Sequence, residues 1–195
     1  MPPIEQNLLI RAAQTGDAPA FEQLLTGCYD QIFRFAFRWC GNRTDAEDIT
    51  QLACIKLAQS LGQFRFEAAF SSWLYRLVIN CAKDWHRSQQ RHQHDDLEQL
   101  EGEIRSDQRA ESSIYLLQIL QFLDSLAEGF KETVLLVHAE GLTHAEAATV
   151  LHIKESTVSW RLHEIRKQLQ HLQQGDGSWE VSVESDQKRA FALLF

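Results

Sequence analysis

The fold of the C-terminal half is decided by residues 143–169, THAEAATVLHIKESTVSWRLHEIRKQL. Thr143 precedes a short apolar pattern and has Glu146 three residues later, which is the spacing of a capping box at the start of a helix. We therefore predict a short helix over His144–Leu151 and a turn at residues 152–154. Because helical spacing of apolar residues resumes directly after the turn, the stretch as a whole is predicted to be a helix-turn-helix.

The second helix of this motif is predicted to begin at Glu155 or Ser156 and to run past Leu169. Its apolar residues recur at steps of four and three, which places them on one inward face. These residues are Val158, Leu162, Ile165, Leu169 and Leu172. In such motifs the second helix enters the major groove of DNA, where its first residues meet base edges. The other faces carry the candidate DNA-binding residues, namely Ser156, Thr157, Ser159, Trp160, Arg161, His163, Arg166 and Lys167. The alternative is a structural helical hairpin with a solvated polar face.

The turn between the two helices contains an unusual residue. His152 stands where turns of this kind commonly use glycine, which adopts a positive φ without steric cost. Histidine tolerates that conformation better than most residues. We therefore expect the turn to form with some strain.

Helical spacing also dominates the N-terminal part of the chain, and the whole sequence has only nine glycines and three prolines. Helices are predicted over about residues 4–15, 17–41, 44–61 and 71–88. Asp17 is expected to cap the second of these helices. Thr44 with Glu47 has capping-box spacing for the third. The chain is therefore predicted to be all-α.

A change of composition divides the chain into two small helical domains. Residues 89–113 are rich in Gln, His, Asp, Glu, Arg and Ser, and they are expected to form an acidic linker in which part of the chain can be helical. The predicted domains are residues 1–88 and residues 114–173, of which the second contains the helix-turn-helix. Residues 174–195 form a tail that ends in the apolar run Phe191–Phe195.

The net charge of −8 is unfavourable for a protein that binds DNA. Much of the acidic excess lies in the linker and in the tail, but neither predicted domain is basic overall. We therefore expect weak DNA binding by the free chain and a partner that supplies affinity. No apolar stretch is long enough to span a bilayer, and the N-terminus does not resemble a signal peptide. The expected location is the cytoplasm, without membrane insertion.

Cysteines and histidines are the candidates for a sensing role. Cys28, Cys40, Cys54 and Cys81 include no Cys-x-x-Cys pair, so core thiols are expected. His86, His92 and His94 form a tight group in a polar stretch, but no metal site and no cofactor is predicted. A metal-sensing or redox-sensing protein stays open as an alternative. No Gly-rich phosphate loop, nucleophile elbow or His-Glu-x-x-His motif is present, so the chain is not expected to be an enzyme.

Two sets of motifs resemble a known family. Residues 45–51 (DAEDITQ), 64–65 (FR) and 70–80 (FSSWLYRLVIN) resemble region 2 of extracytoplasmic-function (ECF) sigma factors of the sigma-70 family. Residues 123–126 (LDSL), 143–148 (THAEAA) and 156–163 (STVSWRLH) resemble region 4 of the same family. The resemblance covers roughly residues 8–88 and 114–171. Two motif sets in this order, joined by a linker, are more specific than a lone helix-turn-helix.

The resemblance implies an alternative sigma factor that binds core RNA polymerase, recognises two promoter elements and helps to open the duplex. An anti-sigma factor is an expected partner. The implied contacts of residues 45–61 with the clamp helices of the largest polymerase subunit are Asp45, Asp48 and Gln51. The implied minus-ten contacts are Phe64, Arg65, Arg76, Asn80, Lys83 and Arg87, because melted bases need aromatic, amide and cationic groups. The eight candidates on the second helix of the helix-turn-helix are the implied minus-thirty-five contacts.

Region 4 departs from the family pattern at three positions. Ser159 and Glu164 stand where lysine and arginine are common, and Trp160 replaces a small residue. An outward Trp160 could touch a thymine methyl group or be covered by an apolar segment, for which Phe191–Phe195 is a candidate. The alternative function is an operator-binding transcriptional regulator with an N-terminal helical sensor domain. It predicts tight DNA binding without polymerase, and it leaves the pattern of residues 45–80 unexplained.

Overall fold

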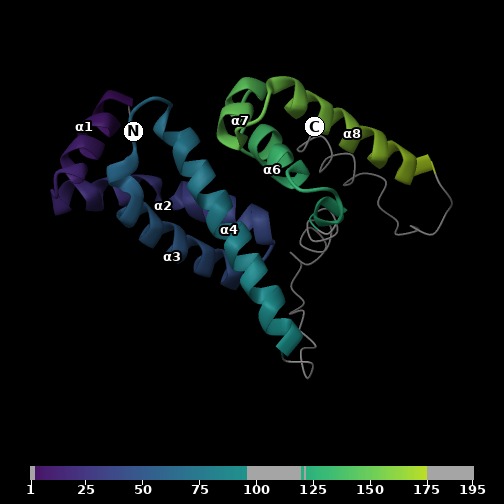
Figure 1. Cartoon of the computed structure of the whole chain (residues 1–195), viewed down its shortest axis with the longest axis horizontal. Helices are drawn as coiled ribbons and strands as arrows, with labels where there is room; N and C mark the ends of the chain where they lie inside the picture. Colours follow the sequence, from purple (N-terminus) through teal and green to yellow (C-terminus); the bar gives the residue numbers. More distant parts are fainter. Residues whose placement is uncertain (1–2, 96–119, 121, 175–195) are drawn as a thin grey trace, which may run out of the picture. The chain divides into compact units, whose positions relative to one another are not determined.

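The computed structural model describes residues 3–95, 120 and 122–174, and every regular element within them is helical. The chain divides into two compact units, Met1–Leu120 and Gln121–Phe195, which we describe one at a time (Figure 1). The predicted all-α fold is confirmed. None of the helices in the described part of the chain has the length and apolar character needed to cross a membrane.

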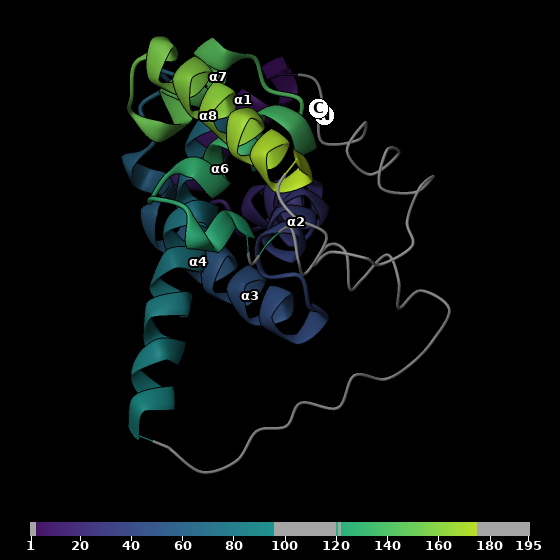
Figure 2. The same cartoon turned by 90° about the vertical axis from the view of Figure 1, so that its right-hand side faces the viewer.

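The first unit is a bundle of four long helices with a short connecting turn. Its elements are α1 (Pro3–Gln14), α2 (Ala18–Cys40), α3 (Arg43–Ser60), the 3₁₀ turn η1 (Leu61–Gln63) and α4 (Phe70–Asp95). The long α2 packs against α1, α3 and α4. α3 also packs against α4, and the two helices can be followed side by side in Figure 2. The fourth helix is longer than the sequence predicted, since it continues from residue 88 to Asp95 into the segment that was expected to be linker.

Large apolar side chains fill the centre of this bundle. Phe35 and Ile32 of α2, Leu57 of α3 and Leu74 of α4 are each at most 1% exposed. The rings of Phe35 and Tyr75 lie with their centroids 5.5 Å apart. These contacts join three helices, so the outer faces of α3 and α4 are held in a fixed relation to each other.

The cap of α2 agrees with the sequence prediction. The Asp17 carboxylate accepts a hydrogen bond from the backbone N–H of Ala20 at 3.0 Å. Pro19 stands in the first turn, where its missing N–H costs nothing. At the other end, Gly41 adopts φ 78° and its N–H donates to the carbonyl of Phe37, which ends the helix.

The predicted cap of α3 was wrong. Asn42, and not Thr44, caps this helix, because its side-chain oxygen accepts a hydrogen bond from the N–H of Asp45 at 2.9 Å. The Asn42 amide also donates to the Asp45 carboxylate. Glu47 pairs with Arg43 at 2.8 Å instead of completing a capping box. The reason is that Gly41 ends α2 so tightly that Asn42 is already extended, and asparagine is among the best N-caps.

The second unit contains the predicted helix-turn-helix. Its labelled elements are α6 (Phe130–Val134), the π-helical turn η2 (Leu135–Ala139), α7 (His144–Leu151) and α8 (Glu155–Gln174). Residues 122–125 are also helical, and the Lys131 ammonium holds them to α6 through the Asp124 carboxylate at 2.7 Å. α8 packs against α6 and α7. Leu136 of η2, Val150 of α7 and Ile165 of α8 are each at most 1% exposed.

Both ends of α7 agree with the sequence prediction. Thr143 accepts a hydrogen bond from the Glu146 N–H at 3.2 Å, and the Glu146 carboxylate accepts one from the Thr143 N–H at 2.8 Å. The pKa of Glu146 is lowered first by the bond from the Thr143 N–H and then by a second bond to its carboxylate, which the Thr143 hydroxyl donates at 2.7 Å. His152 ends the helix in the left-handed conformation with φ 54° and ψ 42°. The expected turn with a strained histidine is thereby confirmed.

Candidate nucleic-acid and polymerase interfaces

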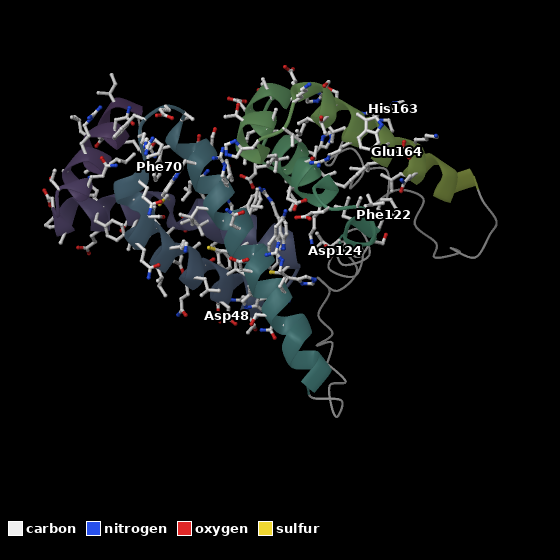
Figure 3. The ribbon with its side chains drawn as sticks, viewed as in Figure 1. Asp48, Phe70, Phe122, Asp124, His163 and Glu164 are labelled. Carbon is white, nitrogen blue, oxygen red and sulfur yellow. The ribbon has the colours of Figure 1, made fainter. Side chains whose placement is uncertain are left out.

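One stripe of side chains faces outward along α8. Ser156, Trp160, His163 and Lys167 follow one another at steps of four, three and four, so they share one side of the helix. All of them are exposed, and Trp160 is the largest at 55% exposed. Figure 3 labels His163 and Glu164 on this helix. The opposite side holds Val158, Leu162 and Ile165, which are buried as predicted.

Arg161 differs from its neighbours because its guanidinium turns toward α6. It donates to the carbonyl of Gly129 at 3.0 Å and to the hydroxyl of Thr133 at 3.3 Å. Its central carbon lies 5.9 Å from the centre of the Phe130 ring. All of these contacts lie within the second unit. In this conformation the guanidinium is turned away from the outward face, and the contact of Arg161 with DNA stays a prediction.

Ser159 connects the two helices of the helix-turn-helix. Its hydroxyl lies 2.9 Å from Nδ1 of His144 and also donates to the carbonyl of Glu155 at 3.2 Å. Thr157 is half-buried, whereas Ser156, Arg166 and Lys167 are exposed. The candidates on α8 therefore fall into an outward set and a set that is engaged inside the unit.

The predicted polymerase-binding residues lie on an exposed face of α3. Asp48, which Figure 3 labels, and Gln51 are exposed, while Asp45 is half-buried beside the cap. Leu52 and Ile55 share this face at helical spacing and are 43% and 54% exposed. The sequence interpretation omitted these two residues. The sequence pattern did contain this information. The side of α3 opposite its buried residues carries Asp48, Gln51, Leu52 and Ile55, which follow one another at steps of three, one and three.

An open groove of about 350 Å³ lies between α3 and α4. Leu52, Ile55 and Leu77 give it apolar walls, and Arg76 and Asn80 contribute polar groups. Partial burial lowers the pKa of the Arg76 guanidinium. Further residues line the groove: Lys56, Gln59, Ser60, Gln63, Trp73, Cys81 and Asp84. Two of the predicted minus-ten residues therefore lie beside the apolar part of the α3 face.

The remaining minus-ten candidates differ in how far their side chains are exposed. Phe64 is only 5% exposed, and its ring packs against those of Phe66, Phe70 and Trp73 at centroid distances of 4.8, 5.5 and 5.6 Å. Arg65 is exposed beside it, and Lys83 is half-buried. Arg87 is exposed and pairs with Asp84 at 3.0 Å. Phe64 thus shapes the loop at residues 64–69 from inside, and in this conformation it offers no open ring face to a base.

The cysteines belong to the packing of the first unit. Cys28 and Cys81 are buried, Cys40 and Cys54 are half-buried, and all are free thiols. Burial raises the pKa of Cys28 to about 12 and that of Cys81 to about 11. Thiols with such pKa values are protonated at neutral pH and react slowly. The described residues contain no group of three or more metal-binding side chains placed to hold an ion.

Comparison with known proteins shows the family. Residues 24–92 match sigma-70 region 2, and residues 116–169 match sigma-70 region 4. The chain is 31% identical over 176 residues to the RNA polymerase sigma-H factor of Pseudomonas aeruginosa, covering 82% of this chain and 89% of that protein. It is 30% identical over 164 residues to the ECF sigma factor SigM of Mycobacterium tuberculosis, covering 84% and 82%. It spans 63% of the ECF sigma factor SigE of Mycolicibacterium smegmatis at 31% identity.

Solved structures show the same fold. CnrH in complex with the cytosolic domain of CnrY matches 89% of this chain and 99% of that chain with a TM-score of 0.65 at 23% identity. The sigma factor RpoE in complex with the anti-sigma factor NepR from Bartonella quintana matches 80% and 98% with a TM-score of 0.59 at 24% identity.

The two matched regions and the curated relatives define a class, the sigma-70 type of transcription initiation factor. Within this class the chain belongs to the extracytoplasmic-function (ECF) sigma factor family. The resemblance seen in the sequence is thereby confirmed, as is the prediction that the chain is not an enzyme. The alternative of an operator-binding regulator with a sensor domain is set aside, because residues 24–92 match region 2 instead.

Proposed function

We propose that this chain binds core RNA polymerase through the exposed face of α3, with α4 and α8 contacting the minus-ten and minus-thirty-five elements of its promoters. The observation that carries the proposal is the combination, in one chain, of an exposed apolar and polar face on a region 2 helix with a complete helix-turn-helix in region 4. The corresponding location is the cytoplasm, where polymerase and chromosome are found.

The α3 face has the composition of a protein interface. Leu52 and Ile55 form an apolar centre, and Asp48 and Gln51 give it a polar rim. Apolar centres surrounded by polar groups are typical of protein–protein contacts. Asp45 contributes through the cap of α3, where it fixes the start of the helix.

The minus-ten element is assigned to the α4 side of the groove, opposite the α3 face, and to the loop beside it. Arg76 and Asn80 lie in the groove, where an amide can make paired hydrogen bonds to a base edge and a guanidinium can contact the backbone. Arg65, Lys83 and Arg87 supply further positive charge. Phe64 supports the loop through its ring contacts.

The minus-thirty-five element is assigned to the outward stripe of α8, in the manner of other recognition helices. Ser156, His163 and Lys167 offer hydroxyl, imidazole and ammonium groups, and Thr157 and Arg166 flank them. Ser159 and Arg161 hold α8 to its neighbours in the same unit through the contacts described above, Ser159 at the surface. Because the chain has a net charge of −8, polymerase is needed to hold both DNA contacts at once.

An anti-sigma factor is part of the proposal. Both structural relatives named above were solved with a protein partner, CnrY in one case and the anti-sigma factor NepR in the other. Leu52 and Ile55 leave an apolar surface open in the free chain. An inhibitor that covers this surface would exclude polymerase by direct competition.

Reconstitution with core polymerase tests the proposal. Holoenzyme assembled from the purified chain is expected to start transcription at a defined set of promoters when starts are mapped across the genome. Ile55→Asp places a charge at the apolar centre of the α3 face, and we expect it to weaken polymerase binding by about tenfold or more, since buried unpaired charge is costly.

Leu8→Asp is the matched control for this variant. Leu8 is 65% exposed on α1, a helix to which no polymerase contact is assigned, so a charge there should leave polymerase binding unchanged. Equal losses in the two variants would contradict the assignment of the α3 face. A wild-type holoenzyme without promoter-specific starts would overturn the proposed function.

A further inference from the structure

A large aromatic side chain stands at the centre of the outward face of α8. Trp160 lies in the second turn of this helix, which begins at Glu155, and it is 55% exposed. Ser156 precedes it by one turn on the same stripe, and His163 follows. The first turns of a recognition helix are the part that meets base edges. The inference drawn from this position rests on the proposed function.

The indole of Trp160 is held from behind by Phe130. The two rings meet edge to face, with centroids 5.6 Å apart and planes at 69°. Phe130 is itself 6% exposed at the start of α6, so it forms part of the rigid core of the unit. Edge-to-face pairs are a favoured arrangement of aromatic rings. The exposed part of Trp160 is therefore pre-organised.

Arg161 supports this arrangement from the other side. Its guanidinium bonds the carbonyl of Gly129 and the hydroxyl of Thr133, and it lies beside the Phe130 ring. Gly129 has φ 93°, and a Cβ atom there would come within 2.4 Å of the guanidinium. The arginine thus occupies the space that this glycine leaves, and it locks Phe130 and the start of α6 against α8. Arg161 acts on Trp160 through Phe130 and is a positioning residue.

The chemistry of the indole indicates what it contacts. Thymine presents a C5-methyl group in the major groove, and apolar side chains recognise it there. Ser159, the next residue, has its hydroxyl engaged by His144 and by the carbonyl of Glu155. We propose that Trp160 is a specificity-determining residue that packs on the C5-methyl group of one thymine in the minus-thirty-five element, in the orientation set by Phe130 and Arg161.

Removing single methyl groups from the DNA tests this proposal. Holoenzyme would first be used to map the promoters, and each thymine of the minus-thirty-five element would then be replaced by deoxyuridine, which lacks only the methyl group. With the wild-type chain, we expect deoxyuridine at one of these positions to weaken promoter binding about fourfold. This factor corresponds to the free energy of burying one methyl group. With Trp160→Ala we expect weaker binding overall and no further loss at that position.

His163→Ala is the matched control, since it removes another exposed side chain from the same stripe. With this variant, replacing that thymine by deoxyuridine should still weaken promoter binding about fourfold. Phe130→Leu keeps the core apolar but removes the supporting ring. It should reduce the ratio between binding to the thymine DNA and binding to the deoxyuridine DNA, while circular dichroism shows that the free chain remains folded. A merely structural role of Phe130 would weaken binding to both DNAs equally and leave their ratio unchanged.

The possible failures are distinguishable. If the wild-type holoenzyme initiates at its promoters but shows no deoxyuridine effect, or shows the same effect with Trp160→Ala, the inference is wrong and the proposed function stands. If the wild-type holoenzyme does not initiate at specific promoters, the proposed function fails and the inference fails with it.

Discussion

Asn42 shows how a single residue sets the start of a helix. It occupies the one position between the glycine that ends α2 and the first turn of α3, and its side chain bonds the Asp45 N–H. Its extended backbone lets the side-chain oxygen reach the N–H groups that the first turn leaves without a partner. Thr44, two residues later, already lies inside the helix and is exposed.

We expect Asn42→Ala to lower the free energy of unfolding of the chain by about 1 kcal/mol, because the cap hydrogen bond is lost. Urea unfolding followed by circular dichroism measures this change. Thr44→Ala is the control, and it should change the free energy of unfolding by less than about 0.5 kcal/mol, as is usual for exposed sites. A larger loss from the threonine variant than from the asparagine variant would contradict the observed cap.

Among the elements, the turn η2 brings a titratable side chain into the second unit. His138 lies in η2, and burial lowers its pKa below the ordinary value of 6.5, with smaller contributions from the positive charges of Arg166 and His144. The folded unit therefore binds fewer protons than the unfolded chain once the pH falls below 6.5. The stability that His138 contributes is complete above this pH and is lost progressively as the pH falls toward the lowered pKa.

We expect His138→Gln to reduce the loss of stability between about pH 7.5 and pH 5.5, the range in which histidines change charge. Thermal unfolding at the two pH values measures the difference. His163→Gln, at an exposed position of α8, is the matched control for exchanging a histidine for glutamine. Identical pH dependence in the wild type and in His138→Gln would show that another group controls it.

The elements also show what sequence patterns predict well. The helix-turn-helix was located to the residue at α7, because the Thr143–Glu146 capping box and the apolar spacing are local signals. The cap of α3 was missed because Thr44 and Asn42 are both good caps, and only the tight end of α2 decides between them.

The interfaces were less predictable for a related reason. Phe64, Ser159 and Arg161 all carry groups suited to DNA binding. Their orientations depend on Trp73, His144 and Gly129, which are 9, 15 and 32 residues away in the sequence. Leu52 and Ile55 were missed because an apolar residue on a helix is normally assigned to the core. In each case, packing against other helices or loops decides whether the side chain faces outward, and the chemistry of the single residue does not reveal this packing.

At the scale of the whole molecule, net charge governs how the chain meets DNA. With 27 acidic and 19 basic residues, the free chain is expected to bind a promoter fragment weakly and with little dependence on sequence. The same fragment should be bound much more tightly by the holoenzyme. Titration of labelled promoter and scrambled DNA with each species measures the difference, and tight, promoter-selective binding by the free chain would contradict it.

The Gln14 side chain gives the first unit an unexpected chemical vulnerability. Its amide nitrogen donates to the carbonyls of Leu61 and Phe64 at 2.9 and 2.8 Å, so one NH₂ group ties α1 to the connection that leads into α4. Conversion of this amide to a carboxylate, as in deamidation, would keep the shape of the side chain but remove both donors and set an anion against two carbonyl oxygens. A change of one atom at the end of α1 would thus loosen the loop that carries Arg65, although Gln14 itself is not assigned to a DNA contact.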